Sequence, residues 1–341
     1  MKFVVESLFH PYHSLGVVGD GCVVGLRDQA ETEVAKVPWP GSKYDPTEMG
    51  IKKPKAPFDY WMKVSPGPVK TINLKSVSKA FIYMQCFEST EMTSWFPKNN
   101  FEEADVFACP SNFIKKCLPY TQPKLIWNHG IHPQNILRKE HPNINDPLRV
   151  LFAGKLDTRK YGDEFIELFA KKFGNSRDIE LIVKTQPDYD VKIKKYKNIS
   201  FIRKELAVEA LNKLYCKCDV FMMPSRGEAF GIMGLEAAAT GLPIISTNWG
   251  GQLDYIDDCL VEKIPYKLIT TPNDGPWMGK WADPEDDVII DAILKFHNNR
   301  ELLSQAILKQ QDIINKWSWS AVTGRFLNQL KTCQRYTKST T

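Results

Sequence analysis

Short apolar runs alternate with segments of helical periodicity along most of the chain. The apolar runs predict strands at 2–6, 32–37, 80–85, 104–109 and 124–128 in the first half and at 148–153, 179–184, 199–203, 219–223 and 243–246 in the second. Apolar residues three and four apart predict helices at 111–118, 162–173, 205–216, 231–240, 286–296, 300–316 and 320–334. Because strands and helices alternate, we expect an α/β protein built on parallel sheets.

A polar, proline-bearing segment from Lys139 to Pro147 interrupts the alternation near the middle of the chain. The length of 341 residues allows two domains, at roughly 100–200 residues each. We therefore expect two α/β halves that face each other across a cleft. Residues 38–70 depart from the pattern, because their many prolines disfavour regular strand ladders.

The overall composition is that of an ordinary globular protein. With 45 Lys and Arg against 40 Asp and Glu, the net charge of +5 is too small to indicate a nucleic-acid partner by itself. The start of the chain does not read as a signal peptide, and no apolar run approaches the ~20 residues of a membrane span. The eight cysteines are scattered, so we expect free thiols in a cytoplasmic protein and no metal site.

The positive charge is concentrated between residues 50 and 80, where seven lysines stand against one acid, Asp59, and give a local charge of +6. One interpretation is a solvated, lysine-rich loop. The other is a surface for an anionic acceptor, with aromatic side chains that stack on it. The residues of this possible acceptor surface are Lys52, Lys53, Lys55 and the aromatic residues Phe58, Tyr60 and Trp61.

The stretch from Met223 to Pro243 carries the clearest chemistry. A strand runs into a polar turn, a helix begins near Gly231, and Gly241-Leu242-Pro243 ends it. The helix N-terminus therefore lies at the carboxyl edge of a parallel sheet, where such folds bind ligands, and its free N–H groups and dipole favour an anion. Two carboxylates spaced by eight suit hydroxyls at two ends of one ligand, with phosphate between them. The expected ligand-binding residues are Glu228, Ala229, Phe230, Gly231, Ile232 and Glu236.

This stretch resembles the E-x7-E signature of the retaining GT-B glycosyltransferases of family four, whose usual form is PS-x-x-E-x-FG-x-x-x-x-EA-x-A-x-G-x-P. The chain keeps every fixed position of that pattern, from Pro224 and Ser225 through both glutamates to Pro243. The following Gly250-Gly251 is similar to the family's next loop. The resemblance implies a GT-B fold, with two Rossmann-like domains and a last helix that crosses back to the first domain. The implied domains are 1–141 on the acceptor side, 142–316 for the nucleotide sugar, and 317–341 for the last helix.

A second element of the family is G-R-L-x-x-x-K-G, in which an Arg and a Lys neutralise a diphosphate. This chain has Gly154-Lys155-Leu156, then Lys160, with Tyr161 inserted before Gly162. Lys155 takes the place of the Arg, and a lysine is a point charge where an arginine is a two-pronged donor. Arg159 is a candidate to supply the fork.

Further segments are similar to the family more loosely. They are the stretch 104–113, the turn 128–132 and Trp317-Ser318-Trp319. In the first half, Gly16 is placed where the family has a glycine loop at the donor phosphates. The family often has a His after a first-domain strand, where this chain has Gln85, and His13 is a second candidate on the acceptor side.

The resemblance implies transfer of a sugar from a nucleotide-diphosphate donor to an acceptor hydroxyl, with the anomeric configuration retained and without a metal or another cofactor. Lys155 and Lys160 would stabilise the leaving diphosphate, Glu228 would bind the donor sugar and Glu236 the ribose, with the base near Arg203. The acceptor would be a glycan or a glycolipid. Two alternatives stay open: a DNA-modifying glycosyltransferase that acts on a hydroxymethylated base, and a non-catalytic module that only binds a nucleotide sugar.

Overall fold

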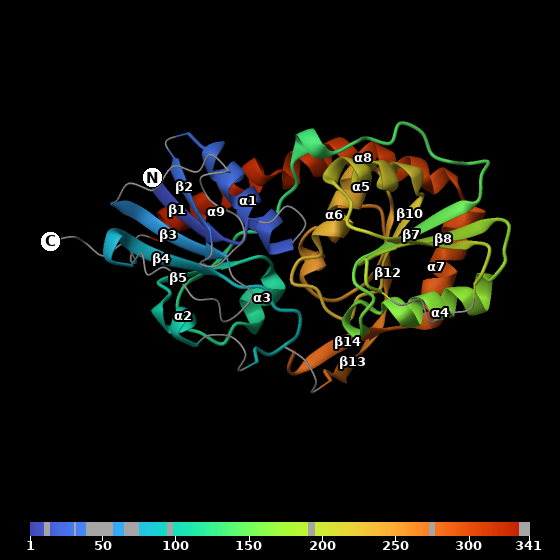
Figure 1. Cartoon of the computed structure of the whole chain (residues 1–341), viewed down its shortest axis with the longest axis horizontal. Coiled ribbons are helices and arrows are strands. Elements are labelled where there is room, and N and C mark those ends of the chain that lie inside the picture. The colour runs from blue at the N-terminus through green and yellow to red at the C-terminus, as the bar shows by residue number, and fades with distance from the viewer. Residues whose placement is uncertain are drawn as a thin grey trace. The chain divides into compact units, whose positions relative to one another are not determined.

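The computed structural model describes residues 1–9, 14–30, 32–38, 57–64, 75–93, 98–189, 195–272 and 277–333. The chain forms two compact units. Unit 1 comprises Met1–His132, Pro272–Gly279 and Lys316–Thr341, and unit 2 comprises Pro133–Thr271 and Lys280–Asn315. Each unit contains a six-stranded sheet, so the predicted α/β class is confirmed (Figure 1). The domain bounds expected from the sequence, and the cleft between the halves, stay predictions.

The sheet of unit 1 has the strand order β2-β1-β3-β4-β5-β6, and every neighbouring pair is parallel. Its strands are β1 (Lys2–Ser7), β2 (Glu33–Pro38), β3 (Phe58–Val64), β4 (Ser78–Met84), β5 (Val106–Cys109) and β6 (Lys124–Ile126). Apolar side chains at consecutive positions, as in β4 and β5, are buried because a central parallel strand is covered on both faces.

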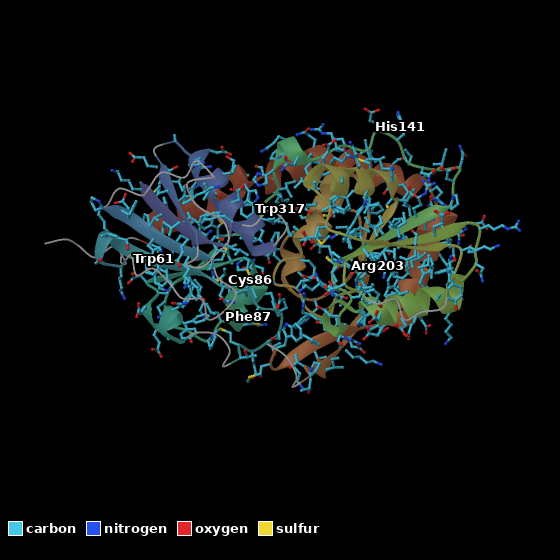
Figure 2. All side chains as sticks on the ribbon, in the orientation of Figure 1. Trp61, Cys86, Phe87, His141, Arg203 and Trp317 are labelled. Carbon is cyan, nitrogen blue, oxygen red and sulfur yellow. The ribbon has the colours of Figure 1, made fainter. Side chains whose placement is uncertain are left out.

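Strand β3 corrects the expectation that residues 38–70 contain no regular ladder. It pairs with β1 and β4 in the centre of the sheet. Trp61 is only 2% exposed, stacks on Phe81 at 4.1 Å between ring centroids, and donates a hydrogen bond from Nε1 to Glu6 (Figure 2). Phe58 is also buried, and Tyr60 stacks on Phe3. Phe58 and Trp61 therefore belong to the core of unit 1 and offer no stacking face to an acceptor, whereas Tyr60 is half-buried and its role stays a prediction.

The last helix packs on the first helix within unit 1. The helices of this unit are α1 (Ser14–Arg27), α2 (Lys98–Glu103), α3 (Asn112–Cys117) and α9 (Trp319–Thr332), with a short 3₁₀ turn η1 (Lys75–Val77). Glycines of α1 allow the close approach, since a methyl group on Gly21 would lie 2.0 Å from the Trp319 ring. The helix α9 is further tied to the sheet by Gln329, whose amide exchanges two hydrogen bonds with the backbone of Ile126.

The sheet of unit 2 has the order β12-β11-β10-β7-β8-β9 and is parallel throughout. Its strands are β7 (Leu148–Ala153), β8 (Ile179–Thr185), β9 (Ile199–Arg203), β10 (Val220–Met223), β11 (Ile244–Thr247) and β12 (Val261–Ile264). Strands β7 and β9 begin and end where the apolar pattern predicts. One face of the sheet packs against Phe165, Phe169 and Ile293 from two helices, which forms the core of this unit.

The remaining elements of unit 2 surround this sheet. Its helices are α4 (Gly162–Phe173), α5 (Val208–Lys217), α6 (Ile232–Thr240), α7 (Asp286–Asn298) and α8 (Glu301–Trp317), whose last two residues count with unit 1. The strands β13 (Tyr266–Thr270) and β14 (Lys280–Pro284) pair antiparallel outside the main sheet. Short 3₁₀ turns are η2 (Pro133–Asn135), η3 (Thr158–Lys160), η4 (Gly251–Asp254) and η5 (Ile256–Asp258).

All eight cysteines are free thiols, as the scattered spacing predicts. Among the described residues, none of the helices has both the length and the apolar character that crossing a membrane requires.

Candidate functional site

The site in unit 2 is built where β10 leads into α6. Strand β10 ends at Met223, and α6 begins at Ile232 after a turn. Gly231 caps the helix in the left-handed region, at φ 77°, which explains glycine at this position because other residues adopt it only at a cost. Its carbonyl accepts a hydrogen bond of 2.7 Å from the hydroxyl of Tyr255. The turn is thereby fixed at the carboxyl edge of the sheet, as the sequence predicts.

Glu228 is a buried carboxylate, 5% exposed, in the middle of this turn. Its Oε1 accepts a hydrogen bond of 2.7 Å from Ser225 Oγ and pairs with the ammonium of Lys160. Its Oε2 lies 3.7 Å from Nη1 of Arg159. Burial raises the pKa of Glu228, but Lys160, Arg159 and the hydrogen bonds outweigh it, so the pKa lies below its ordinary value. Glu228 is therefore ionised at neutral pH.

The two cations come from the turn that follows β7. Asp157 caps this turn by accepting a hydrogen bond of 2.8 Å from the amide of Lys160, and Arg159 donates one of 2.7 Å from Nη1 to the carbonyl of Gly227. Gly154 has a φ of 150°, in the region that favours glycine. The structure thus brings Arg159 and Lys160 to Glu228, although Lys160 and Glu228 are 68 positions apart in the sequence. Lys155, by contrast, is exposed.

The inserted Tyr161 joins this turn to α4. It adopts the left-handed conformation, with φ 57°, which ends the 3₁₀ turn η3 and starts α4 at Gly162. Its hydroxyl donates a hydrogen bond of 2.6 Å to Asp286 at the start of α7. The single left-handed residue thus joins the 3₁₀ turn η3 directly to the first residue of α4.

Glu236 has the opposite electrostatic character to Glu228. It lies on α6, half-buried, and its Oε2 accepts a hydrogen bond of 3.3 Å from the buried hydroxyl of Tyr215. Burial raises the pKa of Glu236 to about 7, although the Tyr215 hydrogen bond lowers it. The site therefore holds one carboxylate that is ionised and one that titrates close to neutral pH.

The rest of the turn is closed by backbone contacts. The amide of Gly251 donates a hydrogen bond of 2.8 Å to the carbonyl of Glu228, and a methyl group on Gly251 would lie 1.9 Å from the carbonyl oxygen of Ala229. The ring of Phe230 is buried and packs against Tyr255. Side chains at 229 and 230 therefore belong to the core, which leaves only their backbone to face a ligand.

Residues 133–263 match the model of the family described as glycosyl transferases group 1. This part, less than half of the chain, is similar to that family, and we refer to residues 133–263 as the group 1 domain. It contains both loops of the site, and it confirms the resemblance carried by Glu228 and Glu236.

Other comparisons cover a larger share of the chain. The chain is 24% identical over 271 residues to an uncharacterized glycosyltransferase of Methanocaldococcus jannaschii, in an alignment that covers 74% of this chain and 62% of that protein. The chain thus spans less than two thirds of this relative's length. A sucrose-phosphate synthase from Thermosynechococcus elongatus superposes with a TM-score of 0.67 at 12% identity, over 98% of this chain and 100% of the other. A glycosyltransferase from Rickettsia africae gives 0.67 at 14%, over 98% of both. At these identities the likeness shows the fold, and the predicted GT-B architecture is confirmed.

The group 1 domain places Arg203, the residue expected near the donor base, at the end of β9 (Figure 2). Its side chain is exposed, and Nη1 donates a hydrogen bond of 3.2 Å to the carbonyl of Tyr189. Its role in binding the base stays a prediction, as do the roles of Lys155 and Ile232.

Unit 1 contains the candidates expected outside the group 1 domain. Gly16 lies in the first turn of α1. Gln85 is buried after β4, where it accepts a hydrogen bond from Tyr83 and donates one to the carbonyl of Cys86. His129 lies 3.9 Å from the Cys86 sulfur, and burial lowers its pKa to about 3. The predicted acceptor-side residues His13, Lys52, Lys53 and Lys55 lie outside the described residues.

Sequence reasoning missed three side chains of the group 1 domain that support the site. Tyr215 reaches Glu236 from α5, and Tyr255 reaches Gly231 from the loop after β11. Arg226 lies inside the signature at a position that the family pattern leaves open. The tyrosines give no sequence signal, because their spacing to the motif is set by the packing of α5 and η4 on α6. Arg226 does give a sequence signal, because a charged residue inside a motif of mostly small and apolar residues requires partners if it is buried.

Proposed function

We propose that the protein is a metal-independent glycosyltransferase, which moves a sugar from a nucleotide-diphosphate donor to an acceptor hydroxyl with retention of configuration. One observation carries the proposal: the buried carboxylate of Glu228 lies between two cations at the N-terminus of α6. Anions bind at such helix termini, and a carboxylate beside them accepts hydrogen bonds from sugar hydroxyls. The family of residues 133–263 supports the same chemistry.

The reaction breaks the bond between the anomeric carbon and the leaving phosphate oxygen. It forms a bond from that carbon to the acceptor oxygen, and the acceptor proton passes to the leaving phosphate. Negative charge therefore grows on the diphosphate, where Lys160, Arg159, Lys155 and the backbone N–H groups of 229–231 would stabilise it. Because these groups are already positively charged or pre-oriented, the proposal needs no metal ion. Lys160 pairs with Glu228 in this structure, so a bound diphosphate would compete for its ammonium group.

The two glutamates take different parts of the donor in this proposal. Glu228, which is ionised, would accept hydrogen bonds from hydroxyls of the donor sugar. Glu236 would accept them from the ribose, and only its ionised form has all its lone pairs available for this. The nucleobase would lie against the backbone from Ile202 to Lys204.

The acceptor in this proposal is a glycan or a glycolipid. The alternative of a modified DNA base depended on aromatic side chains beside the lysines, and Phe58 and Trp61 are buried in the core of unit 1. A salt-dependent shift of duplex DNA by the protein would restore that alternative, since phosphate contacts give affinities that fall steeply with salt.

The donor is tested by thermal unfolding with UDP-glucose, GDP-mannose and ADP-glucose. A donor at 100 times its Kd stabilises the folded protein by about 2.7 kcal/mol, whereas a sugar that does not bind causes no shift. Product release is then measured with the stabilising donor, and NMR of the product gives the anomeric configuration. Donor binding without turnover would instead support the non-catalytic module. If no nucleotide sugar stabilises the protein, the proposed function is wrong.

A further inference from the structure

Arg226 is a buried arginine, 9% exposed, that lies two residues before Glu228. Its guanidinium donates from Nε to Asp283 on β14 and from Nη1 to Glu164 on α4, both at 2.7 Å. Nη1 also donates to the carbonyl of Thr158, at 2.7 Å. The guanidinium carbon lies 4.6 Å from the centre of the Tyr161 ring. The side chain therefore contacts the turn η3, which carries Arg159 and Lys160, together with α4 and β14.

The backbone of Arg226 joins the same elements. Its amide donates a hydrogen bond of 2.7 Å to the carbonyl of Arg159, and its carbonyl accepts one of 3.0 Å from the amide of Ala282. In the reverse direction, Arg159 donates to the carbonyl of Gly227. The loop that carries Glu228 and the turn that carries Lys160 are thus held together by hydrogen bonds on both sides of the ion pair.

Stability alone is a poor reason for this arrangement. The carboxylates of Asp283 and Glu164 are 38% and 37% exposed, so solvent screens both ion pairs. The guanidinium itself is buried, and a buried charge is often replaced by an apolar side chain of similar volume without loss of stability. What an apolar side chain cannot reproduce is a planar donor that fixes three acceptors from three elements in one geometry.

We propose that Arg226 is a positioning residue, which holds the turn of Thr158–Lys160 at the separation from Glu228 that the reaction needs. This inference rests on the proposed function. Tyr161 gives the reason why this chain needs such a residue: the insertion lengthens the turn between Lys160 and α4, and Arg226 covers the inserted ring while it binds the carbonyl of Thr158. If this turn were loose, Lys160, which would hold the diphosphate, and Glu228, which would hold the sugar, would move independently of each other.

The test is Arg226→Met, assayed with whichever of UDP-glucose, GDP-mannose and ADP-glucose the wild-type protein turns over. We expect kcat to fall about 10- to 100-fold, because a displacement of about 1 Å at a reacting group costs that much, while KM for the donor changes less than about threefold. The matched control is Arg149→Met, since Arg149 also pairs with two acids of unit 2, Asp146 and Glu180, away from the site. The control is expected to keep the wild-type kcat.

A double-mutant cycle separates positioning from a general structural effect. If Arg226 acts through Lys160, then adding Arg226→Met to the Lys160→Ala variant lowers kcat further by less than about threefold, because the lysine that Arg226 positions is already absent. Asp283→Asn serves if Arg226→Met does not fold, and we expect it to lower kcat about threefold. The inference is overturned if Arg226→Met and Asp283→Asn keep the wild-type kcat, or if the loss is fully additive with Lys160→Ala. If the wild-type protein turns over none of the donors, the proposed function fails instead.

Discussion

The raised pKa of Glu236 predicts that this glutamate destabilises the free protein at neutral and alkaline pH. A carboxyl whose pKa is about 7 in the folded state, against about 4.3 in an unfolded chain, binds its proton more tightly when folded. The folded state therefore holds more protons between these two values, and the free energy of unfolding falls as the pH rises through that window. Above pH 7 the whole cost of ionising a buried group is present.

The magnitude follows from the two pKa values. At 1.36 kcal/mol per pH unit, the full difference gives an upper value of about 3.6 kcal/mol at pH 8 and about 1 kcal/mol at pH 5. Because Glu236 is half-buried, solvent screening reduces the measured effect, and we expect about 1–2 kcal/mol at pH 8. Glu236→Gln removes the charge but keeps an acceptor for Tyr215. It should therefore be more stable than the wild-type protein at pH 8 and nearly equal to it at pH 5.

The assay is reversible urea unfolding at both pH values, followed by tryptophan fluorescence, with NMR titration of the Glu236 carboxyl as a direct measure of its pKa. Glu209→Gln is the control, since Glu209 is an exposed glutamate of α5 whose hydrogen bond and ion pair with Lys213 lower its pKa. The same substitution at Glu236 should weaken donor binding at pH 8, and wild-type donor affinity should fall as the pH drops below 7. A Glu236→Gln protein that gains no stability between pH 5 and pH 8 would refute this reasoning.

Three further predictions concern the charge of Lys160 and the backbone or packing of two glycines, Gly231 and Gly21. Lys160→Ala should lower kcat about 10²- to 10³-fold in a steady-state assay, because it removes charge stabilisation of the leaving diphosphate, and NMR should find the pKa of Glu228 raised. Gly231→Ala should lower the free energy of unfolding by about 1 kcal/mol in urea, since its φ of 77° disfavours a Cβ. Gly21→Ala should lower it by about 1–3 kcal/mol, because the methyl group meets the Trp319 ring; a wild-type midpoint for either glycine variant would contradict the packing described.

The sequence predicts β7 to β11 and the ends of α4 closely, because consecutive apolar residues and amphipathic spacing are both clear there, but it does not predict β12, β13 or β14. It fails for β3, whose aromatic residues lie between prolines and lysines that mimic a surface loop. Trp61 reads as a ligand-stacking residue in sequence and is a core residue in the structure. The apolar pattern also does not predict α1, since four glycines lower its helix propensity. The reason for two of them is visible only in the fold, where Gly21 and Gly25 make room for α9.

For the site, the sequence gives the residues but not their interactions. The spacing of Glu228 and Glu236 and the lysines after β7 identify the two loops, and the resemblance assigns their roles. The ion pair between Lys160 and Glu228 joins residues that only the parallel pairing of β7 with β10 brings together. The contrast between the two glutamates depends on burial and on which cations face each carboxylate, and neither quantity is encoded in a local pattern.

The electrostatics of the loops explain how a site this rich in cations is stable without its donor. Burial by itself raises the pKa of Glu228, but Lys160 and Arg159 lower it and keep the carboxylate ionised. In turn, its single negative charge offsets one of their two positive charges, so the carboxylate takes part of the electrostatic role that the proposed phosphate would have. A nucleotide-sugar donor would bring a diphosphate that pairs with the cations and sugar hydroxyls that bind the carboxylate. Both sides of the ion pair would then have a new partner. A ligand with only one of the two parts would leave either Glu228 or the cations uncompensated, and the arrangement therefore favours an intact nucleotide sugar over its fragments.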